Sequence, residues 1–293
     1  MNIVYLVFGN NLEHYQQIYF SIFTAMARKK ENDRIVVIAE DPSLFNFFEE
    51  SVEIIEINKE IIKRWEGQYQ FFWRVKIKAL QLIAEKYPSE SVLYLDGDTF
   101  FYQDLDTVRE GMNNGQNFMH LEEGKLSSLS SKTEKLMWKQ MQGKEYNHIK
   151  IDKNSTMWNA GLIGISKHHL DSLQTVLDVN DAMCADDVTR RLIEQFAFSL
   201  GLGKNTELKS ADHIVGHYWG NKKHWNTIIT NFLKESFMKK HALMQIVENL
   251  KEMDLTQNPV WVKESNTQKR LTKFLNKFYQ NKKTTYIKKQ RLL

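Results

Sequence analysis

A short apolar run that ends at two carboxylates constrains this chain more than any other stretch. Residues 92–95, Val-Leu-Tyr-Leu, come directly before Asp96-Gly97-Asp98. An apolar run of this length with β-branched and aromatic members predicts a buried strand. Side chains two residues apart in an extended segment share a face, so both aspartates can point at one cation, while the glycine permits a close backbone approach. Such oxygen ligands suit Mg²⁺ or Mn²⁺, and the alternative is an ordinary strand end with two solvated aspartates.

The composition indicates a folded, globular protein. A chain of 293 residues with 42% hydrophobic residues can form one large domain, or one domain with an appendage. The single cysteine, Cys184, cannot form an intramolecular disulfide, which favours a reducing compartment. Residues 1–8 lack the positively charged start of a signal peptide and instead predict a first strand. No stretch is long and apolar enough to span a bilayer. We therefore expect a cytoplasmic location, or a peripheral one on the cytoplasmic face of a membrane.

Strands alternate with helices along most of the chain. Strands are predicted at residues 3–8, 35–39, 52–57, 92–95, 118–121 and 158–166, and helices at residues 15–28, 65–86, 171–177 and 187–200. This alternation predicts an α/β fold with a mostly parallel sheet and helices on both faces. Residues 227–293 show helical periodicity and no strand signal, so we expect a helical extension to follow a domain that spans residues 1–226.

The charge of the chain is concentrated at its C-terminal end. Residues 263–293 hold ten Lys or Arg and one Glu, or +9, so the net +4 of the chain leaves −5 for residues 1–262. Apolar residues in this segment follow helical spacing: Leu271, Phe274, Leu275, Phe278 and Tyr279. We expect a basic amphipathic helix that binds an anionic membrane surface. Packing of the apolar stripe on the domain is the alternative, and the acidic body disfavours nucleic acid as a partner.

Several motifs occur in an order that resembles a known family. In sequence order they are Arg74-Val75-Lys76, Asp96-Gly97-Asp98, Asn159-Ala160-Gly161, Glu194-Gln195 and His217-x-x-Gly220-x-x-Lys223. This order resembles glycosyltransferase family 8 of the GT-A fold, which includes glycogenin and bacterial lipopolysaccharide galactosyltransferases. The resemblance runs from Ile3 to about Trp225 and implies a GT-A catalytic domain over residues 1–226. His224 stands where the family usually has Pro, and Phe196 stands where an acidic residue is common.

The resemblance implies a metal-dependent hexosyltransferase. Such an enzyme moves a hexose from a UDP-sugar to a hydroxyl of a glycan or lipid-linked acceptor, with retention of configuration, in the synthesis of surface polysaccharide or glycoconjugates. Asp96, Asp98 and His217 would hold Mn²⁺ or Mg²⁺, and the cation would neutralise the leaving diphosphate. Retention rests on the resemblance alone, and the sequence does not choose the sugar.

Donor contacts are expected near the ends of the first strands and in the family motifs. The candidates are Phe8, Gly9, Asn10, Asp41, Arg74, Lys78, Asp96, Gly97, Asn159, Ala160, Gly220 and Lys223. Arg74 and Lys78 share one helix face, where a solvated basic stripe is the alternative. The Asn159 amide can bind sugar hydroxyls, or it can cap a turn. Lys223 supplies a charge for the phosphates, and Lys222 could take its place.

Three residues are candidates for the chemical step. The resemblance places Gln195 under the anomeric carbon, where an amide would stabilise charge while the diphosphate acts on the acceptor hydroxyl. Glu194 could contact sugar hydroxyls. An inverting enzyme would instead need a carboxylate base, for which Glu194 and Asp187 are candidates. An ordinary helix surface is the alternative for this segment.

Other functions fit parts of the sequence. Asp96-Gly97-Asp98-Thr99 also resembles the motif of haloacid-dehalogenase-type phosphatases, with Asp186-Asp187 as the later acidic pair. In that family the nucleophile normally follows the first strand, whereas three strands precede Asp96 here. A sugar nucleotidyltransferase is disfavoured, because no Gly-rich phosphate loop with a basic residue follows the first strand. A sugar-nucleotide or membrane-binding protein without turnover is the non-enzymatic alternative.

Overall fold

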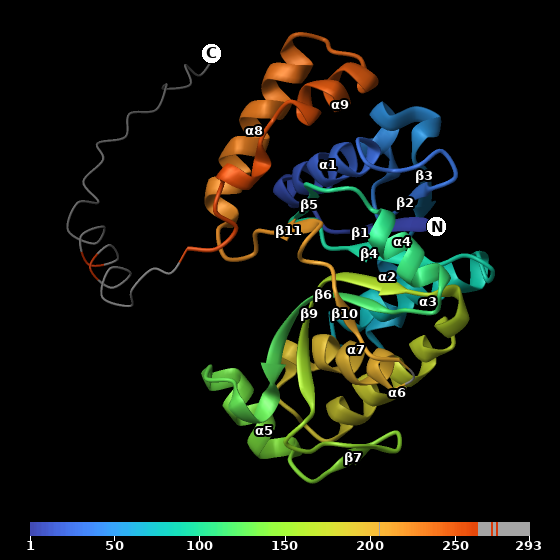
Figure 1. Ribbon diagram of the computed structural model, residues 1–293, viewed down its shortest axis with the longest axis vertical. Helices are drawn as coiled ribbons and strands as arrows, with labels where there is room; N and C mark the ends of the chain where they lie inside the picture. The colour runs from blue at the N-terminus through green and yellow to red at the C-terminus, as the bar shows by residue number, and fades with distance from the viewer. Residues whose placement is uncertain (205, 263–270, 272–273, 275–293) are drawn as a thin grey trace, which may run out of the picture. The chain divides into compact units, whose positions relative to one another are not determined.

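The computed structural model describes residues 1–204, 206–262, 271 and 274 (Figure 1). The chain divides into two units, Met1–Val260 and Trp261–Leu293. In the second unit the side chains of Trp261 and Phe274 are exposed. Most of the basic amphipathic helix expected over residues 263–293 lies outside the described residues. Among the helices that are described, none has the length and apolar character needed to cross a bilayer.

Seven strands form the central sheet of the first unit. They are β1 (Asn2–Val7), β2 (Arg34–Ala39), β3 (Glu53–Glu56), β4 (Val92–Leu95), β6 (Phe118–Lys125), β9 (Thr156–Ile165) and β10 (Lys209–Ser210). Their order is β10-β6-β9-β4-β1-β2-β3. Only β9 runs antiparallel to its neighbours, β4 and β6. The four remaining pairings are parallel, which confirms the mostly parallel α/β sheet predicted from the sequence.

Two small antiparallel sheets complete the described strands. They are β5 (Thr99–Phe101) with β11 (Val215–His217), and β7 (Glu145–Tyr146) with β8 (Ile149–Lys150). The helices are α1 (Leu12–Met26), α2 (Lys59–Glu66), α3 (Arg74–Lys86), α4 (Asp106–Asn113), α5 (Lys132–Met141), α6 (Ser172–Ala185), α7 (Ile193–Gly203), α8 (Lys222–Met238) and α9 (Leu243–Lys251). Short 3-10 helices occupy Pro42–Ser51, Leu126–Ser128, Lys167–His169, Arg190–Leu192 and Leu255–Gln257.

The helices cover both faces of the sheet, as Figure 1 shows, and each face has its own hydrophobic core. In β4, Val92 and Tyr94 join the core under α3, α6 and α7, whereas Leu93 and Leu95 join the core under α1 and α8. A strand that is buried on both faces is apolar at every position. This double burial explains the continuous apolar run before Asp96 and brings that carboxylate out at the end of a central strand.

Helices α8 and α9 belong to the first unit, although a domain boundary was expected after residue 226. Trp225 at the start of α8 stacks on Phe100 of β5, with ring centroids 4.4 Å apart. Ile229 and Ile246 are buried in the same core as the apolar face of α1. The boundary therefore follows Val260. Helical periodicity marks an apolar face, but it does not say which surface that face will cover.

Two helices begin later than the sequence pattern predicts. The helix expected from Trp65 is interrupted, because Gly67 and Gln70 take positive φ angles of 68° and 48°, and α3 starts at Arg74. The helix expected from Asp187 starts at Ile193 as α7, since Asp187 has a φ of 51° and cannot join a helix. Lys76 of α3 and Glu194 of α7 both line a pocket at the end of β4.

Candidate active site

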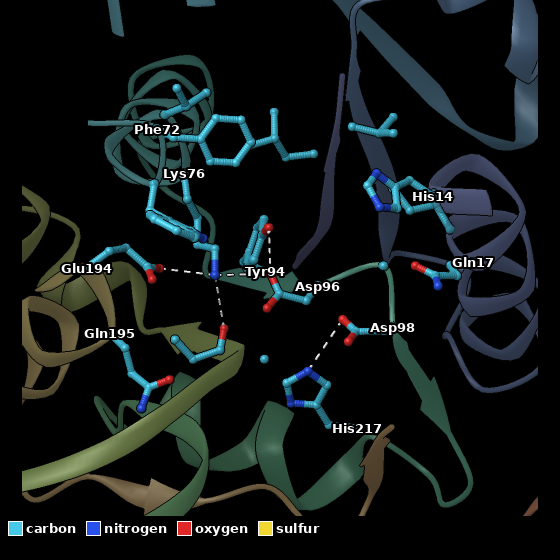
Figure 2. Close-up of a pocket in the computed structure, with 18 of the residues that line it drawn as sticks. His14, Gln17, Phe72, Lys76, Tyr94, Asp96, Asp98, Glu194, Gln195 and His217 are labelled. Atoms are coloured by element: carbon cyan, nitrogen blue, oxygen red, sulfur yellow. Dashed lines mark hydrogen bonds and ion pairs between the residues drawn. The ribbon is translucent and has the colours of Figure 1, made fainter. Parts of the chain in front are cut away.

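Asp96, Asp98 and His217 meet at the carboxyl end of β4. One ligand atom from each of the three lies within 4.8 Å of the others. The pairing of β5 with β11 places His217 opposite Thr99, which brings the imidazole beside Asp98 from a distant part of the sequence. Figure 2 shows the three side chains converging on one region of the pocket. The predicted ligands of the metal are thus assembled as a group.

The imidazole of His217 is held in one orientation. Its Nδ1 lies 2.9 Å from Oδ1 of Asn159, which also accepts the Gly161 N–H at 3.0 Å. An amide oxygen only accepts hydrogen bonds, so Nδ1 of His217 carries a proton. In a neutral imidazole Nε2 then presents its lone pair, and it faces Oδ1 of Asp98 at 3.4 Å. Two electron-rich atoms that face each other suit a shared cation.

Lys76 occupies the centre of the site and joins two carboxylates. Its Nζ lies 3.0 Å from Oδ1 of Asp96 and 3.0 Å from Oε1 of Glu194 (Figure 2). Burial alone would lower the pKa of Lys76, but the two carboxylates outweigh it and hold the pKa above its ordinary value. Burial raises the pKa of Glu194, with Lys76 opposing that shift. Lys76 therefore stays charged, and its ammonium holds the Asp96 side chain in place.

A second lysine reaches Asp98 from the start of α8. Lys222 Nζ lies 2.8 Å from Oδ2 of Asp98, and the lysine side chain is 49% exposed. Burial would raise the pKa of Asp98, but His217, in its protonated form, and the Lys222 ammonium outweigh it and hold the pKa well below its ordinary value. Asp98 is thus a carboxylate over the whole neutral range. The exposed Lys222 ammonium can exchange this partner for an anionic ligand.

These groups line a pocket of about 390 Å³. Phe8 at the end of β1 and Phe72 before α3 pack with ring centroids 5.2 Å apart on one wall. His14 and Gln17 of α1 form another wall, as Figure 2 shows. The pocket lies at the carboxyl ends of the parallel strands β1 and β4, where α/β sheets commonly bind ligands. Its volume falls within the range usual for small-molecule sites.

Gln195 enters the pocket from α7 and is tied to Glu123 of β6. Gln195 Nε2 donates to Oε2 of Glu123 at 3.0 Å, and Asn159 Nδ2 donates to the other oxygen, Oε1, at 3.1 Å. Burial raises the pKa of Glu123, and the two amide hydrogen bonds oppose that shift. Hydrogen bonds therefore connect Gln195, through Glu123 and Asn159, to His217.

Six of the expected site residues line the pocket besides His217 and Asp98. They are Phe8, Asp96, Gly97, Ala160, Glu194 and Gln195. Asn159 lies behind them and contacts His217 instead of the open pocket. Lys76 was predicted only as the last residue of the Arg-x-Lys motif, with no role of its own. Glu123, His14 and Gln17 were not predicted as site residues, because no motif surrounds them.

The structure does not bring the basic pair of α3 to the pocket. Arg74 forms a bidentate pair with Asp181 of α6, at 2.7 and 2.9 Å, and donates to the Trp65 carbonyl at 2.7 Å. Lys78 donates to Gln81 of its own helix at 2.6 Å. Arg74 and Lys78, which were expected to contact the donor, are thus engaged within the fold and do not line the pocket. Lys76, two residues further along than Arg74, points to the site instead.

The remaining candidates also lie outside the pocket wall. Asp41 accepts the Ser43 N–H and caps a 3-10 helix, while the Gly9 N–H donates to Glu40. Neither Asn10, Gly220 nor Asp187 lines the pocket. Lys223 faces the neighbouring groove between α1 and α8, because consecutive helical residues point about 100° apart and Lys222 takes the pocket side.

No family model matches the sequence, and no curated protein does either. Solved structures that are similar to the chain include glycosyltransferases. Mouse xyloside xylosyltransferase 1 has a TM-score of 0.48 and 8% identity over 72% of this chain and 85% of its own. Galactosyltransferase LgtC has a TM-score of 0.48 and 14% identity, over 72% of this chain and 73% of its own. GlyE of Streptococcus pneumoniae has a TM-score of 0.46 and 12% identity, over 82% of this chain and 63% of its own. Scores this low do not assign an activity, which has to come from the site itself.

Proposed function

We propose that this protein is a metal-dependent glycosyltransferase that moves a sugar from a nucleoside-diphosphate donor to an acceptor hydroxyl. The observation that carries the proposal is the convergence of Asp96, Asp98 and His217 in a pocket at the carboxyl ends of β1 and β4. A diphosphate leaving group needs positive charge, and this pocket combines a candidate cation site with two lysines. The family resemblance of the same motifs names UDP as the nucleotide and retention as the stereochemistry.

The residues present fit a divalent cation. Two carboxylates offer oxygen atoms, and His217 offers an imidazole nitrogen whose tautomer is set by Asn159. Mn²⁺ and Mg²⁺ accept oxygen ligands, and Mn²⁺-class ions also accept imidazole. When bound, the cation would supply the positive charge that stabilises a departing diphosphate.

The protein's own residues would bind and orient the donor. Lys222 is half exposed and stands at the first turn of α8, where the helix dipole also favours an anion, so it would bind a phosphate. Phe8 and Phe72 offer aromatic faces on the pocket wall against which the nucleobase would stack. Lys76 would hold Asp96 and Glu194 in place. Gln195 and Ala160 would then border the sugar.

We infer that the acceptor is a hydroxyl of a glycan or of a lipid-linked saccharide, in the synthesis of surface polysaccharide or glycoconjugates. A lipid-linked acceptor would suit a protein on the cytoplasmic face of a membrane. The basic composition of residues 263–293 supports this location. Deletion of residues 269–293 should reduce binding to vesicles that contain anionic lipid, and unchanged binding would refute the membrane proposal.

Calorimetric titration of UDP tests the donor site. Wild-type protein should bind UDP only with Mn²⁺ present, and Asp98→Asn should abolish that binding because a charged ligand of the cation is lost. The matched control is Asp104→Asn, since Asp104 is exposed and lies outside the pocket. Hydrolysis of UDP-glucose or UDP-galactose by the wild type would then separate an enzyme from a binding protein. Failure to bind UDP together with turnover of p-nitrophenyl phosphate would favour a phosphatase.

A further inference from the structure

The geometry points to a positioning role for Glu123, which holds the Gln195 amide so that its carbonyl oxygen, and not its NH₂ group, faces the reacting sugar. This inference rests on the proposed glycosyl transfer and names a residue that carries no family motif. It concerns the orientation of one amide, which would otherwise be free to present either end.

A carboxylate selects one end of an amide. Glu123 has only acceptor atoms when ionised, and both oxygens are used, by Gln195 Nε2 at 3.0 Å and by Asn159 Nδ2 at 3.1 Å. The Nε2 of Gln195 is therefore committed to Glu123. Among residues 1–204 and 206–262, no hydrogen bond is formed to the Gln195 Oε1 atom. Figure 2 shows this oxygen turned toward the middle of the pocket.

Asn159 is fixed more firmly than Gln195. Its Oδ1 accepts from the Gly161 N–H and from His217 Nδ1, so reversing the Asn159 amide would break two further hydrogen bonds. Reversing Gln195 would break only the bond to Glu123. Any change at position 123 that removes one acceptor should therefore reverse Gln195 first and leave Asn159 and His217 as they are.

The end of the amide that faces the sugar matters for the chemistry. The anomeric carbon gains positive charge as its bond to the diphosphate breaks. An amide oxygen is the negative end of its dipole and stabilises that charge, whereas an NH₂ group at the same place opposes it. Glu123 would thus act on the transition state through Gln195, without touching the substrate.

Glu123→Gln is the diagnostic variant. The new amide keeps one acceptor, which Asn159 can retain, and turns its own NH₂ group toward Gln195. Gln195 should then reverse to accept with its oxygen. We expect kcat for UDP-sugar turnover to fall on the order of 10²-fold, while the affinity for UDP with Mn²⁺ changes less than about 2-fold. Glu122→Gln is the matched control, because Glu122 is an exposed neighbour with the same charge. Glu123→Asp keeps two acceptor oxygens and should retain more activity than Glu123→Gln.

The orientation can be read directly from the Gln195 side-chain NH₂ signal in ¹⁵N-labelled protein, assigned by its loss in Gln195→Glu. In the wild type these protons should exchange slowly with water, since Nε2 is bonded to Glu123, and in Glu123→Gln they should exchange faster. A wild-type kcat in Glu123→Gln, or unchanged exchange of this signal, would overturn the inference. If the wild type fails to bind UDP, the proposed function fails, and the exchange measurement still decides whether Glu123 orients Gln195.

Discussion

Gly161 shows how closely the backbone of β9 approaches His217, one of the three candidate metal ligands. A Cβ atom at this position would lie 2.2 Å from Nδ1 of His217, closer than any unstrained contact. The glycine is therefore required by its neighbour's ring and not by an unusual φ angle. The motif Asn159-Ala160-Gly161 thus combines an amide that orients His217 with a residue that makes room for it.

Gly161→Ala should displace the imidazole and abolish metal-dependent binding of UDP. Gly203→Ala is the control, because a Cβ there meets its nearest neighbour at 3.7 Å. Calorimetry with Mn²⁺ measures the effect, and thermal unfolding confirms that the variant is folded. Wild-type affinity in folded Gly161→Ala would show that His217 does not hold the cation.

Substitutions of Arg74 and Lys76 should have different effects, although both residues belong to one motif. Arg74→Met removes a bidentate pair with Asp181 that is only 15% exposed on the arginine side, so stability should fall by about 2 kcal/mol with UDP affinity retained. Lys76→Met leaves Asp96 and Glu194 without the ammonium group that lies between them, and it should reduce both UDP-sugar turnover and stability. Urea unfolding and UDP titration of both variants test this. Loss of UDP affinity in Arg74→Met with unchanged stability would restore the donor-contact role.

At the scale of elements, the pairing of β5 with β11 assembles the site. His217 and Asp98 are adjacent because β11 pairs with β5, whose first residue, Thr99, directly follows Asp98 and lies opposite His217. This pair of strands is anchored by Trp225, which stacks on Phe100 of β5 and on Tyr218 just after β11. An aromatic cluster at this position links the start of α8 to the ligands, so Lys222 is positioned by the same contacts.

The edge strand β3 gives a prediction on pH. Burial would raise the pKa of Glu53, but hydrogen bonds from Tyr87 and Lys86 and the charges of Lys86 and Arg34 outweigh it and lower the pKa below its ordinary value. A carboxyl group whose pKa is lowered by folding stabilises the fold at pH values above its pKa in the unfolded state. This stabilisation is lost as the pH falls through the pKa of the folded state. Glu53→Gln should therefore cost no more than about 1 kcal/mol at pH 7. The difference should shrink below about pH 4.5 in denaturant titrations, and a constant difference across pH would contradict it.

At the scale of the molecule, α8 and α9 complete the core on one face of the sheet. Leu233 and Ile246 pack in the same cluster as the apolar face of α1. Removing these helices would expose that face to water, and the fold would lose about 25 cal/mol of stabilisation for each Å² of apolar surface exposed.

Two truncations should behave differently. A chain that ends at residue 260 should keep the melting temperature and UDP affinity of the full protein, whereas one that ends at residue 226 should not fold. Circular dichroism melting and UDP titration measure both. A cooperatively folded chain ending at residue 226 would instead support the boundary first expected there.

Local sequence patterns predicted six of the seven strands of the central sheet and their alternation with helices. They could do so because a strand buried on both faces, such as β4, is apolar at every position. The grouping of Asp96 and Asp98 with His217 came from the family resemblance of the motifs. Which lysine enters the pocket, where the first unit ends and what Gln195 contacts depend on how the helices pack, which local patterns do not encode. Arg74 and Lys76 differ by two residues on a helix, and only the packing of α3 against α6 turns one to Asp181 and the other to Asp96. Glu123 lies in no motif, so its role arises only when β6, β9 and α7 come together.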